Sequence, residues 1–156
     1  MATDTIRVVD DEIDLVRDLQ RTIAMEIDCR VLTAENGREA VDTLSQTAVD
    51  AVLADILMAE MDGMALMESI KRRGPTVTVI IMTAFGTIEK AVEAIKKGAY
   101  DLIQKPLDEI GDLTLAVQTK LLRVFQDKEI RPLGANTSHQ VDAPSLRRPT
   151  AIWRKE

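Results

Sequence analysis

Apolar runs alternate with stretches of helical periodicity along most of this chain. Five of these runs predict β-strands, and they read TIRVV, CRVLTA, DAVLADI, TVTVIIMTA and YDLIQKP. After the first run, apolar residues recur three and four positions apart, as on one face of an amphipathic helix, at Val16, Leu19, Ile23 and Ile27. Further helices are predicted in ENGREAVDTL, GMALMESIKRRG and TIEKAVEAIKKG. Strands separated by helices of this length predict an α/β fold with a parallel, doubly wound sheet.

Polar side chains stand where the predicted strands end. Asp10 and Asp11 follow the first strand, Asp55 ends the third, Thr83 ends the fourth and Lys105 follows the fifth. Taken singly, Asp10 or Asp11 is more often a helix cap and Lys105 more often a surface charge, so only their combination indicates a site. Because such sheets bind ligands at the carboxyl ends of their strands, we expect all five side chains to face one crevice.

A group of three carboxylates needs charge compensation. Two carboxylates about 4 Å apart repel by about 4 kcal/mol at an effective dielectric near 20, so the group predicts either protonation or a bound cation. Oxygen ligands with room for water suit Mg²⁺, which leaves positions for phosphate oxygens. A carboxylate beside such a metal can attack a phosphoryl group, while a hydroxyl and an ammonium hold the transferred oxygens. Asp55, Thr83 and Lys105 are predicted to fill these three roles.

The motifs VVDDE, DILMAEMDGM, IMTAFGTIEKAVEAIKKGAYD and QKP resemble the receiver domain of two-component response regulators. The resemblance implies a flavodoxin-like (βα)5 fold with strand order 2-1-3-4-5, in which a histidine kinase phosphorylates Asp55. The Mg²⁺ ligands that it implies are Asp10, Asp11, Asp55 and the backbone carbonyl of Leu57. It also implies that Thr83 contacts the phosphoryl group and that Lys105 pairs with it.

Two positions depart from that family pattern. Ala59 stands in the loop after the phosphoacceptor, where proline is usual, and restores backbone freedom there. Leu102 stands three residues before Lys105, where an aromatic switch residue is common, and Tyr100 lies nearby at a different position. We therefore expect phosphorylation to be retained while its readout differs from that of the family.

The chain continues past the receiver-like core, and we divide it into residues 1–107, 108–130 and 131–156. The middle part resembles the Walker B stretch and following helix of the AAA+ domain in sigma-54-dependent activators. No phosphate loop of the form GxxxxGKS or GxxxxGKT occurs, so ATP hydrolysis is not expected. No segment resembles the DNA-binding domain of those activators, so a DNA-binding output is not expected either. Apolar residues at helical spacing predict a fifth sheet-covering helix, at Ile110, Leu113, Val117, Leu121 and Val124. Leu115, Leu122 and Phe125 lie off that stripe and indicate either a homodimer contact or a wider core face.

Charge and composition narrow the class of protein. The chain has 156 residues, 20 basic and 26 acidic side chains, and a net charge of −6, which argues against a nucleic-acid binder. Residues 131–156 carry five basic and two acidic side chains and are predicted to be a flexible tail. The lone Cys29 can form no internal disulfide, and no apolar run approaches the roughly 20 residues of a membrane helix. We expect a cytoplasmic protein with no membrane contact.

Three functions remain open at this point. The first is a phosphoacceptor switch that signals through protein contacts in transcription regulation. The second is a degenerate receiver that serves as a phosphorylation-independent interaction module. The third is a phosphatase with an aspartyl nucleophile, which is disfavoured because Leu57 stands where such enzymes usually carry a second acid.

Overall fold

The structure is a computed structural model, and it describes residues 3–73, 76–84, 88–105 and 110–130 of the chain. Within these residues five strands alternate with five helices. The strands are β1 (Thr5–Val9), β2 (Arg30–Ala34), β3 (Ala51–Asp55), β4 (Thr78–Thr83) and β5 (Asp101–Gln104). The helices are α1 (Ile13–Glu26), α2 (Gly37–Leu44), α3 (Gly63–Arg73), α4 (Ile88–Lys96) and α5 (Ile110–Ile130). The predicted tail at 131–156 lies outside the described residues.

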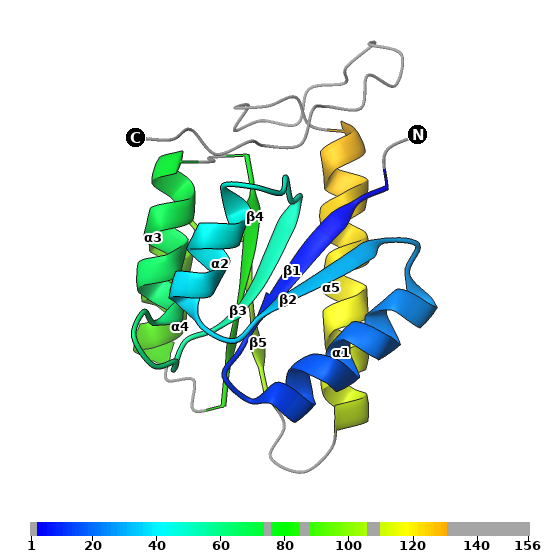
Figure 1. The fold of residues 1–156 in the computed structure, drawn as a ribbon, viewed down its shortest axis with the longest axis horizontal. Helices are drawn as coiled ribbons and strands as arrows, with labels where there is room; N and C mark the ends of the chain where they lie inside the picture. Colours follow the sequence, from blue (N-terminus) through cyan, green and yellow to red (C-terminus); the bar gives the residue numbers. More distant parts are fainter. Residues whose placement is uncertain (1–2, 74–75, 85–87, 106–109, 131–156) are drawn as a thin grey trace.

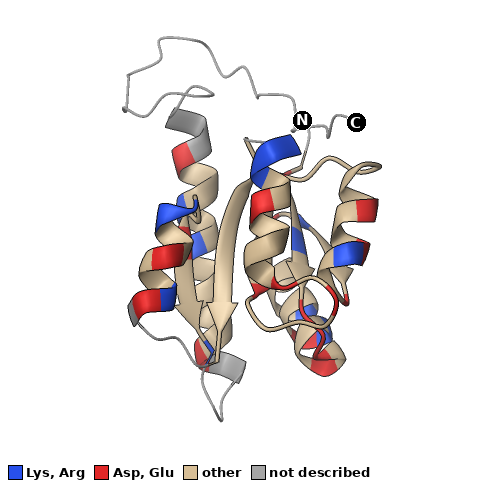
Figure 2. Cartoon of the chain, turned by 90° about the vertical axis from the view of Figure 1, so that its left-hand side faces the viewer, with Lys and Arg blue, Asp and Glu red and all other residues tan. Residues whose placement is uncertain are grey.

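All five strands are parallel and lie in the order β2-β1-β3-β4-β5, which confirms the predicted topology (Figure 1). Every residue of β1 and β3 is buried because helices cover both faces of the sheet. Central strands of this kind carry apolar residues on both sides, which is why they appear in the sequence as continuous apolar runs. The charged residues lie mainly on the helices and loops around the sheet (Figure 2).

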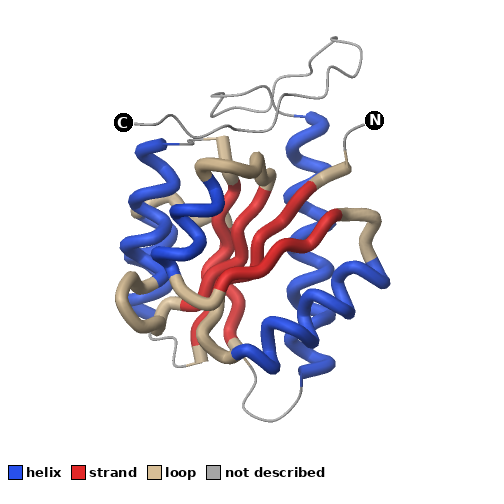
Figure 3. The backbone as a smooth tube through the Cα atoms, viewed as in Figure 1, coloured by secondary structure: helices blue, strands red, loops and turns tan. Residues whose placement is uncertain are grey.

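Two apolar layers hold the helices against the sheet. Val9, Val52 and Ile81 pack on the face covered by α2, α3 and α4, whereas Ile6 and Leu53 pack on the face covered by α1 and α5 (Figure 3). On α5, the residues buried in the second layer are Leu113, Val117, Leu121 and Val124. None of the helices within the described residues is both long and apolar enough to cross a membrane.

One charged side chain breaks the apolar pattern of β1, an interior strand of the sheet. Arg7 is buried, and its Nη1 donates a hydrogen bond of 3.2 Å to the carbonyl of Thr33 on β2. Its Nε has no hydrogen-bond partner among the described residues. Burial lowers the pKa of the guanidinium, and the nearby Glu39 carboxylate opposes that effect. The core of this sheet therefore accommodates a cation that is only partly satisfied.

Candidate functional site

The sheet order brings the predicted site residues to one edge of the sheet. Because Val9 on β1 pairs with Ala54 on β3, the residues that follow them, Asp10 and Asp55, stand side by side at the carboxyl ends of adjacent strands. On the other side of β3, the backbone N–H of Lys105 donates a hydrogen bond of 2.8 Å to the carbonyl of Thr83 at the end of β4. Four strands thus contribute to one site.

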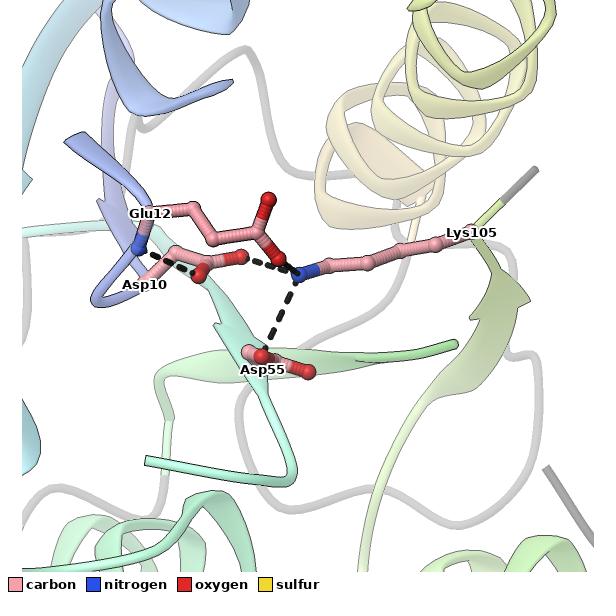
Figure 4. Close-up of polar contacts among 4 residues, drawn as sticks. All are labelled: Asp10, Glu12, Asp55 and Lys105. Atoms are coloured by element: carbon pink, nitrogen blue, oxygen red, sulfur yellow. Dashed lines mark hydrogen bonds and ion pairs between the residues drawn. The ribbon is translucent and has the colours of Figure 1, made fainter. Parts of the chain in front are cut away.

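The ammonium of Lys105 lies at the centre of an ion-pair cluster (Figure 4). Its Nζ is 2.5 Å from Oδ2 of Asp10, 3.1 Å from Oδ2 of Asp55 and 3.4 Å from Oε1 of Glu12. Asp10, Asp55 and Lys105 are buried, whereas Glu12 is exposed. Two buried carboxylates therefore share one buried cation.

Burial changes the acid strength of these groups. Loss of solvent raises the pKa of Asp10 to about 6, although the attraction of the Lys105 ammonium and the hydrogen bond from the Glu12 backbone act in the opposite direction. Loss of solvent also raises the pKa of Asp55, again against the attraction of Lys105. For Lys105, burial lowers the pKa, but the two carboxylates outweigh it and the net pKa is raised. One ammonium does not fully compensate the acids around it.

The helix-cap explanation of Asp10 does not describe its contacts. Helix α1 begins with Glu12 at the N-cap position, and that side chain makes no capping hydrogen bond. Oδ1 of Asp10 accepts a hydrogen bond of 3.0 Å from the backbone N–H of Glu12, which fixes the carboxylate in the turn before the helix. The other oxygen of Asp10 is thereby aimed at Lys105 and Asp55.

The acidic group has a donor set that fits Mg²⁺. Carboxylate oxygens of Asp10, Asp11 and Asp55 lie within 4.8 Å of one another. Oδ2 of Asp10 is buried and has no well-aligned hydrogen bond within the described part of the chain, even though the ammonium is 2.5 Å away. Asp11 is exposed, so the group opens to solvent on one side. Hard oxygen donors with access to water are what Mg²⁺ prefers.

The loop that follows Asp55 is held closely against the end of β3. The backbone N–H of Leu57 donates to the Asp55 carboxylate, while the Leu57 side chain is 55% exposed. A Cβ atom at Gly63 would lie 2.2 Å from the carbonyl oxygen of Asp55, so only glycine fits where α3 begins. The backbone N–H of Gly63 also donates a hydrogen bond of 2.9 Å to the carbonyl of Ile56. The role of the Leu57 carbonyl as a metal ligand stays a prediction.

A tight turn in the same loop includes the position where the family usually has proline. The backbone N–H of Met61 donates a hydrogen bond of 2.8 Å to the carbonyl of Ala59. Between them, Glu60 has a φ of 67°, which is uncommon for a residue other than glycine. The backbone freedom that alanine provides is therefore restricted by a local hydrogen bond.

None of the ion pairs described above includes Thr83, Tyr100 or Leu102. Thr83 is buried at the end of β4, and its carbonyl is linked to Lys105 as described above. Leu102 packs against the layer under α2, α3 and α4, whereas Tyr100 packs against the layer under α1 and α5. Tyr100 therefore does not replace the aromatic residue that is usual at position 102.

Glu12 is not among the predicted site residues, although its Oε1 lies 3.4 Å from the Lys105 ammonium. In the sequence, the one feature that points to Glu12 is its place in the acidic run Asp10, Asp11, Glu12. An acid at the start of a helix is already explained by its favourable interaction with the helix dipole, so the run alone does not assign Glu12 to the site. Its exposed carboxylate adds a third negative charge at the solvent side of Lys105.

Comparison with known proteins identifies the family of this chain. Residues 6–118 match the response regulator receiver domain, and the chain belongs to that family. It is similar to the transcriptional regulatory protein ZraR of Klebsiella oxytoca, with 37% identity over 143 residues, or 91% of this chain and 32% of ZraR. It is also similar to the DNA-binding transcriptional regulator NtrC of Escherichia coli K12, with 35% identity over 144 residues, or 89% of this chain and 30% of NtrC. The chain thus spans about a third of the length of these relatives.

Solved structures give the same result for the fold. The receiver domain of NtrX from Brucella abortus superposes with a TM-score of 0.65 and 33% identity, over 76% of this chain and 98% of that one. A CheY-like receiver domain protein from Methanospirillum hungatei JF-1 has a TM-score of 0.69 and 23% identity, over 81% of this chain and 99% of that one. The predicted family and its five-stranded fold are therefore confirmed.

Proposed function

We propose that this chain is a phosphoacceptor switch in which Asp55 receives a phosphoryl group from a sensor histidine kinase. The observation that carries the proposal is the buried Asp55 carboxylate, 3.1 Å from the Lys105 ammonium and grouped with Asp10 and Asp11. Membership of the receiver family also supports phosphorylation of Asp55. We place the protein in the cytoplasm, where such a kinase would reach it.

The proposed reaction is a direct transfer to a carboxylate. An oxygen of Asp55 attacks the phosphorus of a phosphohistidine, a P–O bond forms, and the P–N bond breaks with its electron pair leaving on the imidazole. Lys105 stays beside Asp55 and compensates negative charge on the phosphoryl oxygens. Thr83, from the neighbouring strand, is proposed to donate its hydroxyl hydrogen to one of these oxygens.

Asp10, Asp11 and Asp55, with the carbonyl of Leu57, are the groups proposed to hold Mg²⁺. When bound, the ion supplies positive charge that offsets the repulsion between the carboxylates and the phosphoryl group. Asp10 contributes a buried oxygen that lacks a well-aligned hydrogen bond, and Asp11 contributes an oxygen at the solvent side. Asp10, which is buried, would hold the ion in a fixed position, and Asp11, which is exposed, would leave the solvent side open to the phosphodonor.

The output is proposed to pass through protein contacts in transcription regulation. The relatives named above are transcriptional regulators, and the similarity to ZraR extends over 91% of this chain. We propose that residues 1–107 are the receiver core and that residues 108–130 serve as its fifth helix, although they resemble part of an AAA+ domain. Because the sequence has no phosphate loop, we propose no ATP hydrolysis for it.

Intact mass after incubation with acetyl phosphate and Mg²⁺ tests the proposal. We expect the wild-type chain to gain the mass of one phosphoryl group, and to gain none when Mg²⁺ is chelated. Asp55→Asn should remain unmodified, while Glu60→Gln, an exposed acid in the same loop, should behave as wild type. A wild-type chain that stays unmodified would favour the phosphorylation-independent module, and rapid turnover of the phosphodonor would favour a phosphatase.

A further inference from the structure

Strand β2 forms one edge of the sheet, because it pairs with β1 and with no other strand among the described residues. In parallel pairing, a residue that turns its backbone polar groups to the neighbouring strand alternates with one that turns them away. The backbone N–H of Arg30 and the carbonyl of Ala34 both bond to the segment that contains β1. Val31 and Thr33 lie at the alternate positions of β2, so their N–H and carbonyl groups point outward from the sheet edge.

Two side chains donate to the outward carbonyls of β2. Gln20 on α1 donates a hydrogen bond of 3.1 Å from its Nε2 to the carbonyl of Val31. Arg7 on β1 donates a hydrogen bond of 3.2 Å from its Nη1 to the carbonyl of Thr33. Arg7 pairs in register with Leu32, so its side chain extends across β2 before it reaches the outer edge. Each of the two outward carbonyls therefore already has a donor from this chain.

Without these donors, the β2 edge would be complementary to itself. In an antiparallel pair of two β2 strands centred on Leu32, Val31 lies opposite Thr33 of the partner subunit. Two outward-facing residues opposite each other in this way exchange both of their N–H to carbonyl bonds. A two-fold axis produces the exchange twice, so the contact is isologous and joins two sheets into one. Unprotected strand edges commonly cause association by this route.

We infer that Arg7 and Gln20 protect the β2 edge: by donating to the two outward carbonyls, they keep β2 closed to the β2 strand of a second copy of this chain. An incoming strand has to displace both donors before its own N–H groups reach these carbonyls. The Arg7 guanidinium also brings a positive charge to the edge, and a second copy brings the same charge to the contact. The inference does not depend on phosphorylation of Asp55.

The unfavourable surroundings of Arg7 support this role. Arg7 is only 4% exposed, and its Nε has no hydrogen-bond partner among the described residues. A buried cation of this kind is costly for a strand that is otherwise mostly apolar. Arg7 takes no part in the ion pairs that join Lys105 to the acidic residues. Protein sheets retain charged side chains at their edges, at a cost in stability, to prevent pairing with another molecule, and Arg7 fits that use.

Sedimentation equilibrium of the full chain at rising concentration tests the inference. In the double variant Arg7→Met with Gln20→Leu, we expect the molar mass to rise from 17.3 kDa toward twice that value. The rise should occur at a concentration at least about tenfold lower than any association of the wild type, because two carbonyls on each copy become free acceptors. Arg17→Met is the matched control, since Arg17 is exposed on α1, and it should behave as wild type.

Thr33→Pro locates the new contact on β2. Proline removes the outward N–H of Thr33, which the pairing with β1 does not use, so the edge strand still forms. Added to the double variant, it should return the mass to the wild-type value. Amide hydrogen exchange at Val31 and Thr33 should slow in the associated double variant and stay fast in the wild type.

Two outcomes would overturn the inference. One is a folded double variant that associates no more readily than the wild type, and the other is an association that Thr33→Pro leaves intact. Circular dichroism establishes whether each variant is folded. Gln20→Leu alone changes a half-buried side chain on α1 and covers the case in which Arg7→Met does not fold. That single variant must then associate more readily than the wild type, and its failure to do so would also overturn the inference.

Discussion

The ammonium of Lys120 on α5 lies 2.6 Å from Oδ2 of Asp101, the first residue of β5. A second polar contact joins the same region, because the hydroxyl of Tyr100 donates a hydrogen bond to the carboxylate of Asp127. The two contacts are about two turns apart on the helix and accompany the apolar packing of α5. They fix the position of α5 along its own axis, which apolar side chains alone specify less strictly.

We expect the Lys120–Asp101 pair to contribute about 0.5 kcal/mol to folding, because both side chains are partly exposed. A double-mutant cycle with Lys120→Met and Asp101→Asn, measured by urea unfolding, gives the coupling energy. The coupling should decrease at 1 M salt, where exposed charges are screened. Lys96→Gln, an exposed lysine on α4, is the control. A coupling of zero at low salt would contradict this expectation.

Replacing Asp10 by asparagine should stabilise the metal-free protein at neutral pH. Burial raises the pKa of Asp10 to about 6 in the folded chain, from 3.8 for a free side chain, so the fold favours the protonated form. For an acid whose pKa is raised by folding, the folded state holds more protons, and the unfolding free energy falls as the pH rises from about 4 to 6. Asp10→Asn should remove this slope and gain about 1 to 3 kcal/mol at pH 7.

Urea unfolding at several pH values, with a chelator present, measures that effect. Asp14→Asn is a suitable control, because Asp14 is an exposed acid in the first turn of α1. The control should keep the pH dependence of the wild type. A variant of Asp10 that is less stable than wild type at pH 7 would show that its ion pair with Lys105 outweighs the cost of burial.

Removal of Asp11 should weaken Mg²⁺ binding with little effect on the metal-free fold. Asp11 is exposed and belongs to the acidic group, so its loss removes an oxygen donor but no core packing. Mg²⁺ at about 100 times its Kd should stabilise the wild type by about 2.7 kcal/mol. Thermal melts of Asp11→Ala with and without Mg²⁺ should show a much smaller gain. An equal Mg²⁺ gain in both proteins would remove Asp11 from the set of ligands.

Truncation of the chain should separate α5 from the residues after it. Ending the chain before Asp112 exposes the sheet face that four buried residues of α5 cover, and each buried Leu or Val contributes about 1.5 to 3 kcal/mol. The loss is comparable to the whole stability of a domain, so we expect this fragment to be unfolded. Ending the chain after Glu129 should cost little, because residues 131–156 have no periodic apolar face. Equal melting temperatures for the two truncations would contradict this.

Replacing Arg7 by methionine should stabilise the fold by about 1 kcal/mol or more, because a side chain of similar volume but without charge replaces a buried cation whose Nε has no hydrogen-bond partner among the described residues. Urea unfolding measures the change. Arg17→Met is the control, since Arg17 is exposed on α1 and should leave the stability nearly unchanged. Destabilisation by Arg7→Met would mean that the hydrogen bond to Thr33 and the attraction of Glu39 outweigh the cost of burial.

Apolar periodicity predicted the sheet well because both faces of this sheet are buried. The run TVTVIIMTA, for example, contains β4, although the strand is shorter than the run at both ends. The ends differ because hydrogen bonding to a neighbouring strand, rather than apolar character, decides where a strand stops. Asp10, Asp55 and Lys105 could be expected together because parallel strands end at one edge.

Contacts between distant surface side chains could not be predicted in the same way. Lys120 and Asp101 are separated by 19 residues, and nothing in the local spacing of either one specifies the other. The same holds for Tyr100 and Asp127, 27 residues apart. These pairs depend on the axial position of α5 along β5, and an apolar stripe tolerates several such positions. Their detection required the three-dimensional arrangement.

The close approach of Gly63 to the carbonyl of Asp55 has a consequence for genetics. A random mutational screen for loss of signalling is expected to recover substitutions of Gly63 together with those of the acidic residues. Alanine there, the smallest possible change, would push the backbone at the end of β3 away from its neighbours. A residue without a side chain, and without any chemistry of its own, would therefore score in such a screen as though it took part in the reaction.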